Sequence, residues 1–175
     1  MQYVVLLRGI NVGGKMVKME SLKKMLEDMG FSNVKTLLNS GNVIVESELT
    51  SLEYLRQSIE EKLTQTFGFI VHVIIRTKAE IAKLVKSDPF RGVHVTKDTR
   101  LYVTFLSEKP HSLLKAPYIS PEKDLHISRI TQSEICTAII VSPNKNTTDM
   151  MGFLEKEFGG EITTRNWNTI LKLLK

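Results

Sequence analysis

The chain of 175 residues has one cysteine, five prolines and one tryptophan. It also lacks the run of about 18 apolar residues that a membrane-spanning helix needs. Its first residues do not combine a charged segment with an apolar stretch, as a secretory leader would. A lone cysteine cannot form an internal disulfide, which suits a reducing compartment. These absences predict a cytoplasmic protein with no membrane partner. Cys136, inside an apolar run, is expected to be a buried, inert thiol.

Signatures of metal and covalent catalysis are missing as well. The four histidines are scattered and do not have metal-ligand spacing; they are His72, His94, His111 and His126. No serine has a G-x-S-x-G setting, and no pair of carboxylates stands out for acid–base work. We therefore expect no metal and no cofactor. The catalytic residues, if the protein is an enzyme, are unknown from the sequence.

The charge is basic but evenly spread. The formal net charge is +5, with an excess of +2 in residues 1–88 and +3 in residues 89–175. A nucleic-acid-binding stripe would instead concentrate Lys and Arg. RNA-binding sheets stack bases on aromatic side chains, and the expected strand over residues 42–46 has none. The sequence thus does not favour nucleic acid as a partner, although it does not exclude it.

The first half of the chain predicts a βαββαβ order. Strands are expected over residues 3–8, 33–38, 42–46 and 70–75, and helices over residues 19–29 and from a capping box of Thr50 and Glu53 to Gly68. A second box, Thr77 and Glu80, opens a short connecting helix. This order is the ferredoxin-like arrangement, with sheet order 4-1-3-2. Because the strands over 3–7 and 43–45 are continuously apolar, both faces of the sheet should be covered, one of them by the second half.

The second half repeats this pattern less cleanly. We expect strands over residues 101–106, 125–130 and 135–141, helical pieces over 111–115 and 149–158, a short extended piece over 161–163 and a last helix. The predicted fold class is therefore α+β, with two tandem ferredoxin-like subdomains, predominantly antiparallel sheets and an extra C-terminal helix. The expected boundaries are 1–86 for the first subdomain and its connecting helix, 87–98 for a linker, and 99–175 for the second.

A glycine-rich loop follows the first expected strand. Gly9-Ile-Asn-Val-Gly-Gly-Lys15-Met16 matches the P-loop pattern G-x-x-x-x-G-K-[ST] except at Met16, where a hydroxyl should hold Mg²⁺. The antiparallel strand order also differs from the mostly parallel sheet of P-loop proteins. These two departures exclude the nucleotide hydrolase. Two interpretations of the loop remain: a tight turn that needs glycine, or a cradle that binds an anion.

The predicted topology brings this loop to the same sheet edge as the turn between the second and third strands. The candidate ligand-binding residues are Arg8, Gly9, Asn11, Gly13, Gly14 and Lys15, together with Asn39, Ser40 and Asn42. Basic groups, amides and free backbone N–H groups suit a phosphate or a carboxylate. The alternative is that Asn39 and Ser40 only form the turn. A tenth candidate, Arg165, would complete the pocket if the last helix docks near the loop.

Four segments carry a family resemblance. Leu6-Leu-Arg-Gly-Ile-Asn-Val-Gly-Gly-Lys15, Gly30-Phe-Ser-Asn-Val34, Ser40-Gly-Asn-Val43 and Thr163-Thr-Arg-Asn-Trp-Asn-Thr169 resemble the bacterial "domain of unknown function" family sixteen-ninety-seven. The resemblance spans essentially the whole chain. It implies a duplicated α+β fold of two ferredoxin-like subdomains, no established activity, and no catalytic residues that could be carried over.

The sequence therefore supports three functional hypotheses. The first is a cytosolic protein that binds a small anionic or phosphate-bearing ligand at the edge formed by residues 9–15 and 39–42. The second is a small enzyme that acts on such a ligand without a metal or a covalent nucleophile. The third is an interaction module for protein or nucleic acid. The identity of the ligand and the oligomeric state are beyond the sequence.

Overall fold

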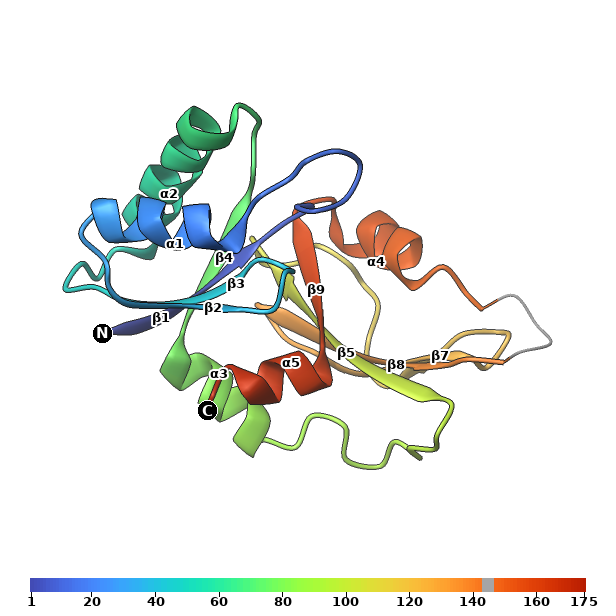
Figure 1. The fold of residues 1–175 in the computed structure, drawn as a ribbon. Coiled ribbons are helices and arrows are strands. Elements are labelled where there is room, and N and C mark those ends of the chain that lie inside the picture. Colours follow the sequence, from blue (N-terminus) through green and yellow to red (C-terminus); the bar gives the residue numbers. More distant parts are fainter. Residues whose placement is uncertain (143–146) are drawn as a thin grey trace. The chain divides into compact units, whose positions relative to one another are not determined.

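The computed structural model describes residues 1–142 and 147–175. The chain divides into two compact units, residues 1–83 with Leu174 and residues 84–173 with Lys175. Each unit contains one antiparallel sheet, and the chain ends in a helix (Figure 1). The α+β class is therefore confirmed. Within the described residues, no helix is both long and apolar enough to cross a bilayer.

The first unit has the predicted order of elements. They are β1 (Gln2–Leu7), α1 (Met19–Asp28), β2 (Ser32–Leu37), β3 (Asn42–Glu46), α2 (Leu52–Phe67) and β4 (Val73–Thr77), and α3 (Lys78–Lys86) follows. The strands lie in the order β2-β3-β1-β4, and each neighbouring pair is antiparallel. This is the sheet order that the sequence predicts. It brings the end of β1, the β2–β3 turn and the start of β4 to one edge of the sheet.

The core of the first unit lies between the sheet and its two helices. Both α1 and α2 cover the same face of the sheet (Figure 1). Tyr3, Val5 and Leu7 point into this core, where they meet apolar side chains that include Leu26 of α1 and Ile59 of α2. On the opposite face the side chains are also buried; they include Val4, Leu6, Ile44 and Ile74. Burial on both faces explains why these strands are apolar without alternation.

One of the two predicted capping boxes is confirmed. At the start of α3, the Thr77 backbone N–H donates to Glu80 Oε2 over 2.7 Å, and the Glu80 N–H donates to Thr77 Oγ1 over 3.1 Å. The box predicted at Thr50 is wrong by one residue. Helix α2 is capped by Ser51, whose hydroxyl accepts from the Tyr54 N–H. The Glu53 carboxylate binds Arg56 and Gln57 instead, so it is not available to close a box.

The second unit contains five strands and two helices among the described residues. They are β5 (Thr99–Leu106), β6 (Tyr118–Ile119), β7 (Leu125–Ile130), β8 (Glu134–Ile140), α4 (Met150–Phe158), β9 (Ile162–Asn166) and α5 (Trp167–Lys172). The sheet order is β6-β7-β8-β5-β9. Without the short edge strand β6, the order of the strands matches that of the first sheet.

One prediction for the second unit is wrong, and another is too short. The segment 111–115 is not helical, because the Ser112 hydroxyl accepts from the Leu114 N–H and Pro117 disfavours helix at the residue before it. The extended piece predicted over 161–163 is the five-residue strand β9, which pairs with β5 from Ile162 to Asn166. Because Thr163-Thr-Arg-Asn166 is polar, the sequence pattern does not indicate the full strand. These residues form a strand because they pair with the largely buried strand β5.

Cys136 is buried in β8, as expected. Its burial, helped by the nearby charge of Glu134, raises the pKa of the thiol to about 12. The thiolate is the reactive form of cysteine, so this residue is chemically inert in the folded protein.

An aspartate ties the segment before α4 to the sheet of the second unit. The Asp124 carboxylate accepts hydrogen bonds from the Thr148 N–H and hydroxyl, both at 2.6 Å, and from the Ser120 hydroxyl at 2.9 Å. Partial burial raises the pKa of Asp124, but these hydrogen bonds favour the charged form more strongly, and the net pKa lies below its ordinary value. The charged carboxylate therefore stabilises this arrangement.

We predict that Asp124→Asn destabilises the second unit at pH 7 by about 1 kcal/mol, because an amide keeps one acceptor oxygen and loses the charge. The unfolded pKa of aspartate is about 3.9. Since the folded pKa is lower, the stabilisation is fully present above pH 5 and disappears as the pH falls through the folded pKa. Urea unfolding followed by the fluorescence of the single tryptophan, Trp167, measures this difference. The difference between wild type and variant should shrink in acid.

Asp98→Asn is the matched control, because the exposed Asp98 carboxylate makes no hydrogen bond within the described residues. An equal loss of stability in both variants would contradict the role of Asp124.

Candidate functional site

The glycine-rich loop forms a closed turn between β1 and α1. The Asn11 N–H donates to the Lys15 carbonyl over 2.7 Å, and the Lys15 N–H donates back to the Val12 carbonyl over 3.1 Å. Gly13 and Gly14 have φ angles of 56° and 84°. Glycine adopts this left-handed conformation without steric cost, so the two glycines allow the chain to reverse within these five residues. Lys18, the last residue before α1, has an extended backbone.

The side chain of Asn11 holds the loop in place. Its Oδ1 accepts from the Val17 N–H over 2.9 Å, and its Nδ2 donates to the carbonyl of Asn39 over 2.7 Å. The second of these bonds joins the loop to the β2–β3 turn, 28 residues away in sequence. The predicted juxtaposition of the two segments is therefore present. Asn11 acts as a bridge between them, so its amide is already engaged within the protein.

The β2–β3 turn approaches the loop closely at Gly41. A Cβ atom at this position would lie 2.8 Å from Leu7 Cβ and from Ile10 Cδ1, and the φ angle of Gly41 is 69°. The residue after it, Asn42, is fully buried, and its Nδ2 donates to Ser40 Oγ over 2.8 Å. Gly41 and Asn42 therefore shape the turn. Asn39 and Ser40 lie at its exposed tip.

The tip of the loop carries exposed polar groups. Across residues 1–142 and 147–175, the backbone N–H groups of Val12, Gly13 and Gly14 donate no hydrogen bond. Lys15 is also exposed, and its Nζ lies 6.0 Å from the centre of the Phe69 ring, a cation–π distance. Four consecutive exposed residues thus carry three N–H groups without a partner among the described residues and one ammonium. Such a set can bind an anion in place of water.

Arg8 connects the start of the loop to the segment before β4. Its backbone N–H donates to the carbonyl of His72 over 2.9 Å, and its side chain is half-buried. Gly9 is exposed and has a φ angle of 63°. The predicted site residues of the first unit, from Arg8 to Lys15 and from Asn39 to Asn42, therefore gather at one edge. They differ in whether they face solvent.

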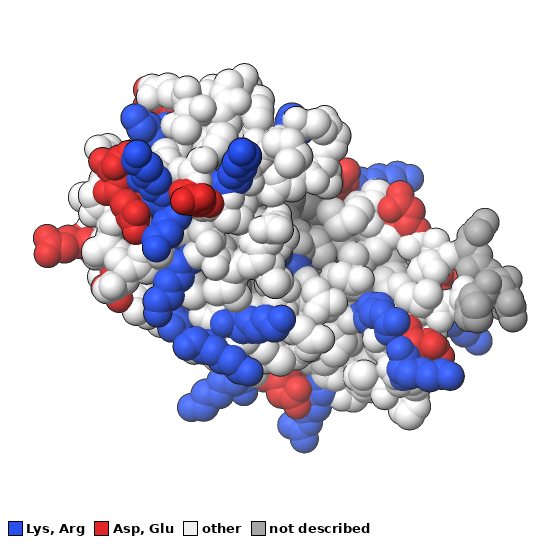
Figure 2. Space-filling model, viewed as in Figure 1, with Lys and Arg blue, Asp and Glu red and all other residues white. Residues whose placement is uncertain are grey.

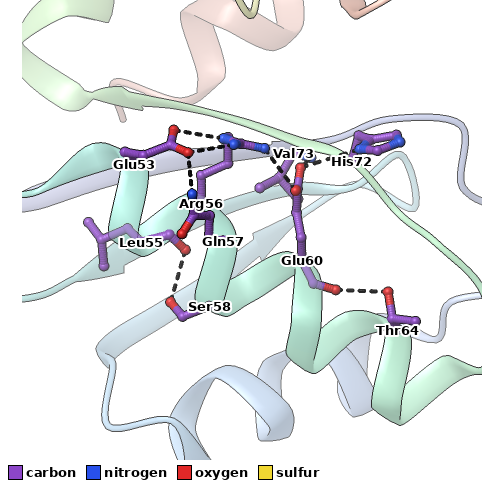
Figure 3. A network of polar contacts seen from close by, with 9 residues as sticks. All are labelled: Glu53, Leu55, Arg56, Gln57, Ser58, Glu60, Thr64, His72 and Val73. Atoms are coloured by element: carbon purple, nitrogen blue, oxygen red, sulfur yellow. Dashed lines mark hydrogen bonds and ion pairs between the residues drawn. The ribbon is translucent and has the colours of Figure 1, made fainter.

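A carboxylate network beside this edge is not evident from the sequence. Figure 3 shows Glu60 of α2 pointing toward the start of β4. Its Oε1 accepts from the Val73 N–H over 2.8 Å and lies 3.6 Å from His72 Nδ1, and its Oε2 accepts from Arg56 over 2.9 Å. Glu60 thereby fastens α2 to β4 next to the residue that binds Arg8. A carboxylate in the middle of a helix has no sequence pattern that links it to a strand outside that helix.

Arg165 belongs to the second unit, where it lies on β9. Its guanidinium is buried and donates to Thr163 Oγ1 over 2.8 Å and to the Thr164 carbonyl over 2.9 Å. Burial lowers the pKa of Arg165 to about 10, so it stays charged at neutral pH. Its expected position beside the glycine-rich loop stays a prediction.

Charges on the surface are mixed. On the face shown in Figure 2, Lys and Arg side chains lie over both units, and Asp and Glu lie between several of them. Among the residues that the structure describes, no three His, Cys, Asp or Glu side chains are grouped so that they could hold a metal ion. The exposed loop tip with Lys15 is thus the candidate site that the geometry supports.

We predict that Glu60→Ala destabilises the first unit by about 1–3 kcal/mol, because it leaves the part-buried Val73 N–H without its acceptor. The lost ion pair with the partly exposed Arg56 adds little. Hydrogen exchange of the Val73 amide should accelerate. Glu61→Ala is the control, since within the described residues the exposed Glu61 carboxylate accepts only from Gln65, over 3.3 Å. Unchanged Val73 exchange in the Glu60 variant would refute this assignment.

We also predict that Asn11→Ala loosens the loop more than Asn11→Gly does. Both changes remove the bridge to Val17 and Asn39, but alanine also has to adopt the φ angle of 57° found at Asn11, at an extra cost of about 1 kcal/mol. Loss of protection at the Val17 amide, measured by hydrogen exchange, reports the broken bridge. Asn39→Ala should have little effect because only the Asn39 backbone takes part. Equal stability of all three variants would contradict the bridging role.

Comparison with known proteins shows a solved structure with a similar fold and identifies the family. The chain has a TM-score of 0.74 to a solved structure titled "The structure of conserved bacterial protein SP0830 from Streptococcus pneumoniae", with 23% identity, over 99% of this chain and 98% of the other. At this identity the likeness shows the fold alone. No curated protein matches the chain significantly. The model of the family described as "Protein of unknown function (DUF1697)" matches residues 1–135, and the chain belongs to this family.

Proposed function

We propose that the first unit binds a small anion, a phosphate- or carboxylate-bearing ligand, at the tip of the glycine-rich loop. The observation that carries the proposal is the run of consecutive exposed groups, namely the N–H groups of Val12, Gly13 and Gly14 and the ammonium of Lys15. The three N–H groups have no partner among the described residues. Asn39 and Ser40, at the tip of the neighbouring turn, are the polar groups next to them.

Rigidity of the loop supports this proposal. The hydrogen bonds of Asn11 fix the loop to Val17 and to Asn39 before any ligand arrives. A binding loop that is already ordered loses little conformational entropy on binding. Asn11 and Asn42 therefore serve as scaffold in this proposal and do not contact the ligand. Arg165 is left out as well, because its guanidinium is buried on β9.

The expected affinity for a bare anion is low. A hydrogen bond to a charged group contributes about 1.5 kcal/mol, and exposure to water reduces this value. Three or four such contacts give about 4 kcal/mol, which corresponds to a Kd of about 1 mM. A tighter natural ligand needs contacts beyond the anion itself.

The strand orders support a proposal about the fold as well. A β2-β3-β1-β4 sheet with two helices on one face is the arrangement of a ferredoxin-like unit. The order β7-β8-β5-β9 in the second sheet corresponds to it strand by strand. We propose that the chain arose by duplication of such a unit. In the second copy, the helix between the first two strands is replaced by an irregular segment and β6. We also propose a cytoplasmic location, on the strength of the single buried cysteine.

Titration with inorganic phosphate at low ionic strength, followed in ¹H–¹⁵N spectra, tests the ligand site. The amides of Gly13 and Gly14 should shift with a Kd of about 1 mM. Lys15→Gln should weaken binding about fivefold, the equivalent of about 1 kcal/mol. Lys62→Gln on α2 removes the same charge from another exposed position and should leave the Kd nearly unchanged. If the loop amides do not shift in wild type, or if both variants behave alike, the site is not where we place it.

A further inference from the structure

The edge that carries the loop also carries exposed apolar side chains. Four of the large apolar residues that remain mostly exposed lie here, namely Val12 at 62%, Met16 at 67%, Leu38 at 52% and Ile70 at 63%. We call these four side chains the apolar rim. Isolated exposed apolar residues are ordinary, whereas a cluster of them marks a binding surface.

Contacts made by the loop and by sequence neighbours of the rim residues place the apolar rim beside Lys15. Val12 and Met16 belong to the loop, where the Val12 carbonyl accepts from the Lys15 N–H. Leu38 precedes Asn39, which is bonded to Asn11. Ile70 follows Phe69, whose ring lies 6.0 Å from Lys15 Nζ. Each rim residue therefore belongs to the loop or is the sequence neighbour of a residue that contacts it. In Figure 1 the loop after β1 and the segment leading into β4 lie at the same end of the sheet.

We infer that the ligand of this site is an amphiphilic anion, a phosphate or carboxylate joined to an alkyl or aryl group, and this inference rests on the proposed function. The anionic group would lie at the N–H groups of residues 12–14 and at Lys15. Its apolar group would lie across the apolar rim, where it also meets the edge of Phe69. A purely polar anion would leave these apolar side chains in water.

The occupant is a water-soluble molecule. Proteins that bind lipid surfaces through electrostatics use several Lys or Arg side chains, or a long amphipathic helix. The loop of residues 9–17 contains one lysine, Lys15, between Val12 and Met16. This combination suits one anionic group and one apolar chain.

An alkyl chain on the anion should increase the affinity by an amount that depends on how much of the chain is removed from water. Each methylene fully removed from water strengthens binding about fourfold. On an open rim, a chain of eight carbons is covered only in part. We therefore expect octyl phosphate to bind at least about tenfold more tightly than inorganic phosphate.

The experiment compares the two ligands on the full chain by ¹H–¹⁵N titration. In wild type, both should shift the Gly13 and Gly14 amides, with the tenfold advantage for octyl phosphate. In Val12→Ser/Ile70→Ser, phosphate binding should persist and the advantage should fall to threefold or less. The control Leu49→Ser/Tyr54→Ser changes exposed apolar residues away from the loop and should retain the full advantage. Both double variants change exposed positions, so their folds should persist.

The possible negative results distinguish between the proposed function and this inference. If neither ligand shifts the loop amides, the proposed function is wrong, and this inference falls with it. If phosphate binds but octyl phosphate gains nothing, or if the gain survives in Val12→Ser/Ile70→Ser, the inference alone is overturned. Co-sedimentation of wild type with vesicles of phosphatidylcholine and phosphatidic acid would overturn the assignment to a soluble ligand.

Discussion

The candidate site depends on the hydrogen bonds of the Asn11 side-chain amide. It accepts a hydrogen bond from Val17 and donates one to Asn39, so one residue closes the loop and joins it to the neighbouring turn. An amide can do this because it carries an acceptor and a donor on one planar group. Asparagine also tolerates the left-handed backbone that the position requires. Gly41 complements the bridge, since any side chain there would push the turn away from Leu7 and Ile10.

This arrangement separates the polar residues of the edge into two groups. Asn11 and Asn42 have their amides engaged inside the protein, where they determine the shape of the two segments. Residues 12–15 are exposed, and that scaffold holds them in place. Polar residues of similar chemistry thus have opposite roles, depending on whether the fold has already given them a partner. Such a division is common where a rigid sheet presents functional loops.

Two basic residues, one near each end of the chain, show how burial changes the environment of a positive charge. Lys15 lies on an exposed loop, and its Nζ is 6.0 Å from the centre of the Phe69 ring. Arg165 lies on β9 with its guanidinium bonded to its own strand, and burial lowers its pKa. Both residues belong to family-like motifs in the sequence. One is therefore exposed to solvent, whereas the other is buried.

Local patterns alone determined much of the first unit. The apolar periodicity of residues 19–29, the continuously apolar strand of residues 3–7 and the Thr77–Glu80 box each encode their structure within a few residues. The βαββαβ order then leads to the sheet order, because the connections allow few alternatives. That order was enough to place the glycine-rich loop beside the β2–β3 turn.

Only the tertiary structure decided the features that depend on distant partners. Strand β9 is polar in sequence, and it becomes a strand because β5 offers it hydrogen bonds along five residues. Ser112 turns its hydroxyl to the backbone and to Glu157, and the helix expected there does not form. Glu60 binds a strand that follows it by 13 residues. The sequence by itself determined that residues 9–15 form a glycine-rich corner beside the turn, whereas the fold decided which of its polar groups remain exposed. Exposure depends on the partners that folding supplies, and a sequence does not display them.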